Sequence, residues 1–171
     1  MPSFMAMKRK ASFPPVVRAD TRLLLLGSLP GEASLRADRY YAHPQNQFWK
    51  LAGAVAGIEG LHERSYEDRL VQLLDAGIGL WDVVADALRC GSLDAAIRDH
   101  RVNDLVALVG TLPRLRAVGF NGATAARLGR KMMTELAEIR LFDLPSSSPA
   151  YTLGFASKLE RWMAMRPCLQ Q

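Results

Sequence analysis

Apolar and polar positions follow one another along the chain in blocks that predict alternating strands and helices. The four consecutive leucines at 23–26 are typical of a strand buried on both faces, and we expect this strand to span 21–26. Short apolar runs predict further strands, at 78–84, 115–120 and 139–144. Apolar residues at three- and four-residue spacing predict helices, at 46–56, 66–76, 123–136 and about 152–165. This alternation indicates an α/β fold, in which helices cover both faces of a parallel sheet.

Three segments between these blocks are less regular. Residues 105–109 (LVALV) predict a helix capped by Asn103, although their β-branched side chains also permit a strand. A short helical turn is expected at 93–97, and a long functional loop at 27–45. The last helix is expected to direct Phe155 and Trp162 toward the core.

The chain is expected to form one domain. Its 171 residues are enough to bury a core, and neither a repeat nor a linker is evident. We therefore expect a single domain at 13–171, preceded by a flexible basic tail at 1–12. The basic residues Lys8, Arg9 and Lys10 in that tail are interpreted as a solubilising terminus rather than as a DNA contact.

Polar and aromatic residues follow the predicted strands at their carboxyl ends, where parallel sheets bind ligands. The first strand is followed by the turn Gly27–Gly31 (GSLPG), then by Tyr40, Tyr41 and Asn46. The other three strand ends carry similar residue types, which are Trp81-Asp82, Asn121-Gly122 and Pro145-Ser146-Ser147-Ser148. We expect these segments to converge on one ligand pocket.

Composition describes an ordinary globular protein with a basic excess. Hydrophobic residues make up 49% and charged residues 23% of the chain. No apolar run approaches the roughly 20 residues of a membrane span, so we expect no membrane association and a cytoplasmic location. The net charge of +5 and the pI of about 9.6 fit contact with phosphate backbones, although similar charge occurs in proteins that never bind nucleic acid.

Several kinds of site are disfavoured. Cys90 and Cys168 lack metal-type spacing and the three histidines are scattered, so we expect neither a metal site nor another cofactor. No glycine loop ends in GKS or GKT, GSLPG is not GxGxxG, and Ser28 has no GxSxG context. What remains is a pocket of neutral amides, hydroxyls, flat rings and one carboxylate, which suits a nucleobase.

Seven stretches carry a family resemblance: GSLPGEASL, YYAHPQNQFW, GLWDV, GSLDAAIRD, VNDL, FNG and LPSSSPA. In this order, from about Phe13 to Trp162, the chain resembles the hypoxanthine-DNA glycosylases, family 6 of the uracil-DNA glycosylase superfamily. AHPQNQFW is also similar to a segment of the mismatch-specific uracil-DNA glycosylases, which carry asparagine where this chain has Ser28. The four cysteines of the superfamily's iron–sulfur branches are missing here.

The resemblance implies a three-layer α/β/α fold on a four-stranded parallel sheet. It also implies a monofunctional enzyme that removes hypoxanthine from double- or single-stranded DNA and leaves an abasic site. The motif match assigns the catalytic role to Asn46, whose amide would hold the attacking water; its alternative role is to cap the helix that contains Phe48. We expect the enzyme to act as a monomer.

The other site residues have expected roles as well as structural alternatives. Gly27, Ser28 and Gly31 would direct backbone N–H groups toward the base or sugar-phosphate, or form a plain turn. Either Tyr40 or Tyr41 would stack on the extruded purine, and the other would belong to the core. These five residues would form one side of the base pocket.

Asp82, beside Trp81, is predicted to govern base preference. Its carboxylate would accept the N1–H of hypoxanthine and repel adenine, whose N1 is an acceptor; alternatively it only stabilises a loop. Asn121 would touch the flipped nucleotide or support its turn. The segment Pro145–Ser148 resembles the superfamily's second motif, which grips phosphate and fills the gap left by the base.

Three alternatives stay open at this point. One is a uracil- or xanthine-preferring glycosylase of the same superfamily. Another is a damaged-DNA-binding protein without catalysis. The third is a protein that binds a small nucleobase or nucleoside and has no salt-dependent affinity for DNA.

Overall fold

The computed structural model describes residues 9–170, which are built around a four-stranded parallel sheet. The strand order is β3 (Ile78–Asp82), β2 (Leu23–Gly27), β6 (Ala117–Asn121) and β7 (Arg140–Leu144). β2 is thus central, and its leucines pair with β3 on one side and with β6 on the other. The predicted fold class, a three-layer α/β/α sandwich on a four-stranded parallel sheet, is confirmed.

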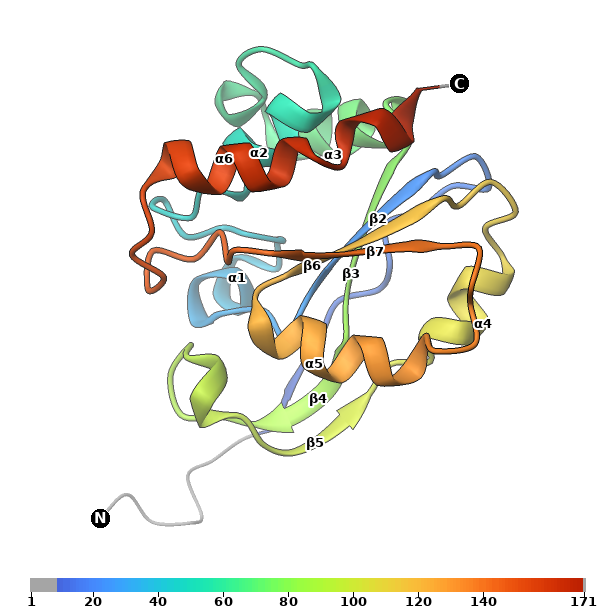
Figure 1. The fold of residues 1–171 in the computed structure, drawn as a ribbon. Coiled ribbons are helices and arrows are strands. Elements are labelled where there is room, and N and C mark those ends of the chain that lie inside the picture. The colour runs from blue at the N-terminus through green and yellow to red at the C-terminus, as the bar shows by residue number, and fades with distance from the viewer. Residues whose placement is uncertain (1–8, 171) are drawn as a thin grey trace.

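The leucine run of β2 is apolar throughout because both faces of the sheet are covered (Figure 1). Leu23 and Leu25 pack into one core cluster and Leu24 and Leu26 into another, and all four are fully buried. Side chains of a strand point alternately to opposite faces, so each helical layer receives two of them. The first layer contains α2 (Phe48–Ala56), α3 (Tyr66–Asp75) and α6 (Phe155–Met163), and the second contains α4 (Leu105–Gly110) and α5 (Ala123–Met132).

A second, smaller sheet of three antiparallel strands was not predicted. It is ordered β1 (Arg9–Ala11), β4 (Val84–Leu88) and β5 (Arg98–Val102). The predicted flexible tail is therefore wrong at Arg9–Ala11, while residues 1–8 lie outside the described residues. The Arg9 guanidinium lies 2.6 Å from the Asp86 carboxylate, and this ion pair joins β1 to β4.

The structure differs from the prediction at the start of α4, in the functional loop and in the orientation of Phe155. The N-cap of α4 is Asp104, which accepts from the Ala107 N–H at 3.0 Å, whereas Asn103 donates to the Asp82 carbonyl at 2.7 Å. The functional loop contains one short helix, α1 (Glu32–Ala37). The expectation that Phe155 faces the core is wrong, because this first residue of α6 is 36% exposed while Trp162 is fully buried.

Short 3-10 turns complete the described chain, at η2 (Leu61–Glu63), η3 (Asp94–Ala96) and η4 (Arg166–Leu169). The helical turn expected at 93–97 is thus confirmed as η3. Within residues 9–170, no helix has the length and apolar character needed to cross a bilayer.

Candidate active site

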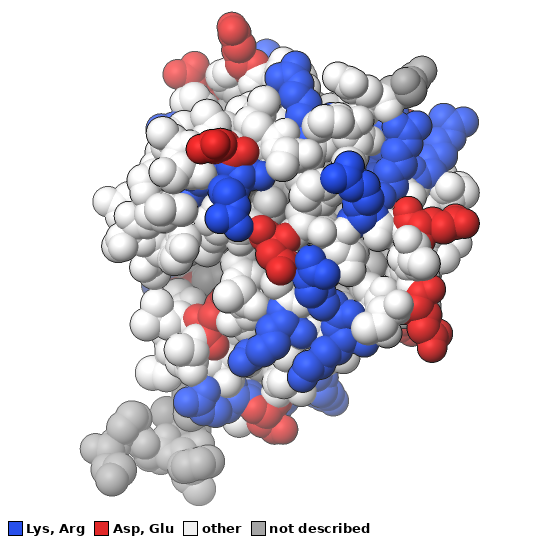
Figure 2. Space-filling model, viewed as in Figure 1, with Lys and Arg blue, Asp and Glu red and all other residues white. Residues whose placement is uncertain are grey.

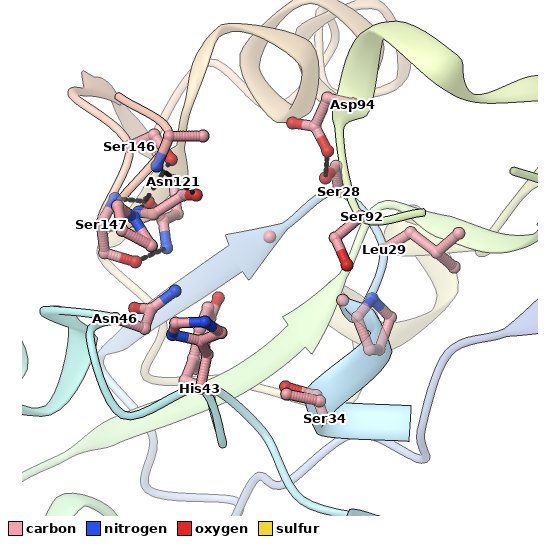
Figure 3. A pocket seen from close by; sticks show the side chains of 18 of the residues that line it. Ser28, Leu29, Ser34, His43, Asn46, Ser92, Asp94, Asn121, Ser146 and Ser147 are labelled. Carbon is pink, nitrogen blue, oxygen red and sulfur yellow. Dashed lines mark hydrogen bonds between the residues drawn. The ribbon is translucent and has the colours of Figure 1, made fainter. Parts of the chain in front are cut away.

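A cavity of about 440 Å³ opens at the carboxyl ends of the parallel strands. This volume lies in the range of pockets that take small organic ligands. The cavity brings together nearly all of the predicted site residues, which are Gly27, Ser28, Gly31, Tyr40, Tyr41, Asn46, Asp82, Asn121, Ser146, Ser147 and Ser148. Figure 3 shows that Ser28, Asn46 and Asn121 come from separate segments and surround a common space.

Two predicted residues do not line the cavity. Trp81 precedes Asp82 in β3, and because neighbouring strand residues point to opposite faces, its indole turns away and donates to the Phe13 carbonyl at 2.9 Å. Pro145 is buried, and its carbonyl accepts from the indole of Trp162 at 2.9 Å. The structure therefore does not bring these two residues to the cavity with the other predicted site residues.

The floor of the cavity is formed by Asp82, Tyr41 and Gly27. The Asp82 side chain is almost completely buried, and its Oδ2 has no hydrogen-bond partner. Burial, followed by the charge of nearby Asp94, raises the pKa of Asp82 to about 7. The carboxyl group can therefore gain or lose a proton near neutral pH.

The two tyrosines have different surroundings. Tyr40 is 4% exposed, and its hydroxyl donates to the Pro14 carbonyl at 2.9 Å, so it belongs to the core although one edge reaches the cavity. The Tyr41 ring stacks on Phe48, with 3.8 Å between ring centroids and 11° between planes. Because Phe48 covers one face of Tyr41, that face cannot stack on a base.

A buried arginine supports the backbone of the glycine turn (Gly27–Gly31). The sequence analysis did not identify this residue. Arg89, at the end of β4, is 2% exposed and donates to the carbonyls of Leu29, Pro30 and Gly91. Burial lowers the pKa of its guanidinium, while the carboxylate of Asp94 opposes this change. Arginine is normally a surface residue, so no local pattern marks it as the support of this turn.

Ser28 does not face the cavity as a free hydroxyl. It donates to Oδ1 of Asp94 at 2.6 Å, which joins the glycine turn to η3 (Figure 3). Burial raises the pKa of the Asp94 carboxyl group, and the hydrogen bond from Ser28 lowers it in part. Asp94 also lines the cavity and was not predicted as a site residue.

The serine loop, residues 145–149, is fastened to its neighbours by hydrogen bonds. The Asn121 amide makes two bonds to Ser147, accepting from its N–H and donating to its hydroxyl, both at 2.9 Å. The Ser147 carbonyl accepts from the Gln47 N–H at 3.0 Å. Buried Lys158 donates to the Ser148 carbonyl at 3.3 Å, and burial lowers the pKa of its ammonium. Asn121 therefore supports the serine loop, a role that differs from the predicted support of its own turn with Gly122.

Asn46 enters the cavity from the segment that leads into α2. Its Oδ1 accepts from the Phe48 N–H at 3.0 Å, so the predicted structural role at the helix start is present. This bond also orients the amide, and its nitrogen points toward the cavity in Figure 3. His43, which was not predicted as a site residue, stands beside it and accepts from the Gln45 N–H through Nδ1 at 3.1 Å.

Positive charge is prominent on the side of the molecule that carries α5 (Figure 2). Lys and Arg side chains gather over this helix, whose basic residues are Arg127, Arg130 and Lys131. Arg130 lies 2.7 Å from the Asp143 carboxylate. Among residues 9–170, no three His, Cys, Asp or Glu side chains are grouped so that they could hold a metal ion.

The fold and the cavity define an α/β/α protein with a polar ligand site at the carboxyl edge of its parallel sheet. Sequence comparison identifies the family: the model of the uracil DNA glycosylase superfamily matches residues 14–167. The chain belongs to the uracil DNA glycosylase superfamily. The predictions of family, enzyme class and DNA glycosylase function are thereby confirmed.

Two relatives and one solved structure are similar over almost their whole length. The hypoxanthine DNA glycosylase of Methanosarcina barkeri is 38% identical over 154 residues, which cover 90% of this chain and 96% of the relative. That of Methanosarcina acetivorans is 38% identical over 156 residues, with 91% and 97% covered. The solution NMR structure of a candidate uracil DNA glycosylase from M. acetivorans superposes with a TM-score of 0.85 at 35% identity, covering 96% of this chain and 100% of that one.

Proposed function

We propose that the protein is a monofunctional DNA glycosylase that hydrolyses the N-glycosidic bond of hypoxanthine in double- or single-stranded DNA. The observation that carries this proposal is the cavity itself, in which Asn46 and the unpartnered carboxyl group of Asp82 face one small space. The two curated relatives bear the name of this activity. An enzyme of this kind must extrude the nucleotide from the stack before it reaches the glycosidic bond.

Asp82 would select the base. Hypoxanthine presents an N1–H donor where adenine presents an acceptor, so an ionised carboxylate accepts from the first and repels the second. Because Asp82 is buried, bulk water does not screen its attraction for hypoxanthine or its repulsion of adenine. Its pKa of about 7 makes the ionised form available at and above neutral pH.

Asn46 would position the attacking water. Its Oδ1 is bonded to the Phe48 N–H, and its amide nitrogen, which points toward the cavity in Figure 3, can donate to the oxygen of the water. An amide is too weak a base to deprotonate that water, so bond cleavage must develop an oxocarbenium-like sugar first. The hydroxyl of the water then ends on the sugar carbon, and its proton leaves for the departing base or solvent.

The serine loop would bind the phosphates that flank the extruded nucleotide. Ser146 Oγ accepts from the Ser148 N–H at 3.1 Å, and Ser148 Oγ accepts from the Ala150 N–H at 3.2 Å. Each hydroxyl therefore keeps its own hydrogen free to donate to a phosphate oxygen. Tyr151 follows Ala150 and is 48% exposed, and it would lie against the DNA strand.

The test is excision from a duplex that contains one deoxyinosine, followed by alkali to cleave abasic sites. The wild-type protein should give a cleaved strand only after alkali, and Asn46→Ala should slow excision at least about 100-fold, the usual cost of losing an aligned polar group. Gln45→Ala is the matched control, because that exposed neighbour does not line the cavity. Near-normal excision by Asn46→Ala would remove the assignment.

Parallel duplexes that carry deoxyuridine or deoxyxanthosine separate the alternative substrates. Faster excision of uracil or xanthine would show that this base, rather than hypoxanthine, is the preferred substrate. Tight binding to damaged duplexes without any cleavage would instead favour a DNA-binding protein without catalysis.

A further inference from the structure

The Tyr41 hydroxyl occupies an unusual position for a side chain in an aromatic cluster. Tyr41 has a left-handed backbone with φ of 52°, which is strained for a residue with a side chain. The ring is held by stacking on Phe48, and the Tyr41 carbonyl accepts from the Trp49 indole at 3.1 Å. These contacts place the hydroxyl at the cavity floor, where it is buried and has no hydrogen-bond partner.

Asp82 meets Tyr41 over Gly27. A Cβ atom on Gly27 would lie 2.6 Å from Oδ1 of Asp82 and 2.9 Å from the Tyr41 hydroxyl oxygen. Only a residue without a side chain leaves room for both groups there. The floor thus holds a hydroxyl and a carboxyl group side by side, and each has a buried atom that lacks a partner within the protein.

Buried polar atoms without partners cost stability, and a ligand that completes them recovers that cost. Burial raises the pKa of the Tyr41 hydroxyl, and the nearby Asn121 amide opposes this change only in part. The hydroxyl therefore stays protonated and is a donor. Asp82, when ionised, is an acceptor. A donor beside an acceptor matches a base edge that presents a carbonyl oxygen next to a ring N–H.

We propose that Tyr41 reads the base together with Asp82, by donating to the carbonyl oxygen adjacent to the ring N–H that Asp82 accepts. This inference rests on the proposed glycosylase function and deepens it, because it defines the substrate class as bases with a lactam edge. Hypoxanthine, xanthine and uracil present that edge. Adenine and cytosine present an amino group beside a bare ring nitrogen, which mismatches Asp82.

The same pairing makes a specific statement about guanine. Guanine keeps the carbonyl oxygen and the ring N–H, so Tyr41 and Asp82 do not reject it. Rejection of guanine must come from contacts at its 2-amino group. A change at Tyr41 should therefore leave the ratio between deoxyinosine and deoxyguanosine unaltered, within the detection limit of the assay.

The experiment is Tyr41→Phe, which preserves the ring and its stacking on Phe48 and removes one oxygen atom. Single-turnover excision rates are measured on duplexes with one deoxyinosine, deoxyxanthosine or deoxyuridine. We expect each substrate that the wild type excises to react about tenfold more slowly, as befits one lost hydrogen bond. Tyr66→Phe is the matched control, because the Tyr66 hydroxyl accepts from the Tyr40 N–H at 3.0 Å outside this cavity.

Urea unfolding separates base reading from a structural role. Since the Tyr41 hydroxyl has no partner, Tyr41→Phe should be at least as stable as the wild type. Wild-type rates for Tyr41→Phe, or a slower reaction together with lower stability, would overturn the inference. A wild-type protein that excises none of the bases would refute the proposed function instead.

Discussion

The serine loop and the floor of the cavity differ in how their polar groups are satisfied. In the loop, Ser147 is bonded to Asn121 and Gln47 through its N–H, hydroxyl and carbonyl. On the floor, the Tyr41 hydroxyl and Oδ2 of Asp82 have no partner. A satisfied network holds its shape without ligand, whereas unpaired buried groups destabilise the empty protein. The difference indicates that the loop is preformed and that the base completes the floor.

The largest effect on stability is expected from removing the hydrogen bonds that hold the serine loop. Asn121→Ala removes two buried hydrogen bonds and leaves the Ser147 N–H unpaired, so the free energy of unfolding should fall by roughly 3 kcal/mol. Urea denaturation measures this loss. Asn121→Asp keeps the acceptor for that N–H and should lose less, and a change below about 1 kcal/mol in the alanine variant would show that the loop is held by other contacts.

A smaller effect on stability, in this case an increase, is expected from substitution of Asp82 on the floor of the cavity. The folded pKa of Asp82 is about 7, above the value near 4 of an unfolded chain, so the folded state favours the protonated form. The contribution of Asp82 to the free energy of unfolding should therefore fall as pH rises from about 4 to 7 and level off above. Asp82→Asn avoids this cost, and its free energy of unfolding should exceed that of the wild type at pH 8.

The comparison of Asp82→Asn with the wild type needs two pH values. The advantage of the variant should shrink at pH 5, where the wild-type carboxyl group is mostly protonated in the folded protein. Exposed Asp143→Asn on β7 serves as the control for a general effect of charge. An advantage that is equal at both pH values would contradict the buried, proton-binding carboxyl group.

The smallest change in stability is expected at Gly27. Gly27→Ala would place a Cβ 2.6 Å from Oδ1 of Asp82 and 2.9 Å from the Tyr41 hydroxyl oxygen. The Tyr41 ring is held by Phe48, but the Asp82 carboxyl group can rotate away, so unfolding should cost about 1 kcal/mol less. Excision should slow at least about tenfold because the floor is displaced. Gly110→Ala, which meets no atom within 4 Å, should change neither, and equal activity of the two variants would argue against a shaped floor.

Much of the fold was predictable because its signals are local. The leucines of β2 and the three- and four-residue spacing of α2 and α3 mark buried surfaces within short segments. The small antiparallel sheet was missed because β5 is exposed at every position and shows no apolar alternation. Its strands are recognisable only through their pairing with β4 and the contact between Arg9 and Asp86.

The candidate site was predictable to the level of its segments but not of every side chain. Parallel strands bring their carboxyl ends to one edge, which placed Asp82 and Asn121 together without any knowledge of contacts. Trp81 was misplaced because the neighbouring strand position faces the other side of the sheet. Arg89 and Lys158 carry no local sign of burial, since charged residues are normally exposed.

By itself, the sequence determined the order of the four parallel strands and of the main helices, the family, and the polar residues that gather at one edge of the sheet. Hydrophobic periodicity and turn residues act over a few positions, so a linear reading recovers them. Only the tertiary structure decided which polar atoms are paired: Asn121 is bound to Ser147, and Tyr41 and Asp82 are left open to a ligand. Hydrogen-bond partners come from segments distant in the chain, and their presence or absence depends on the whole packing.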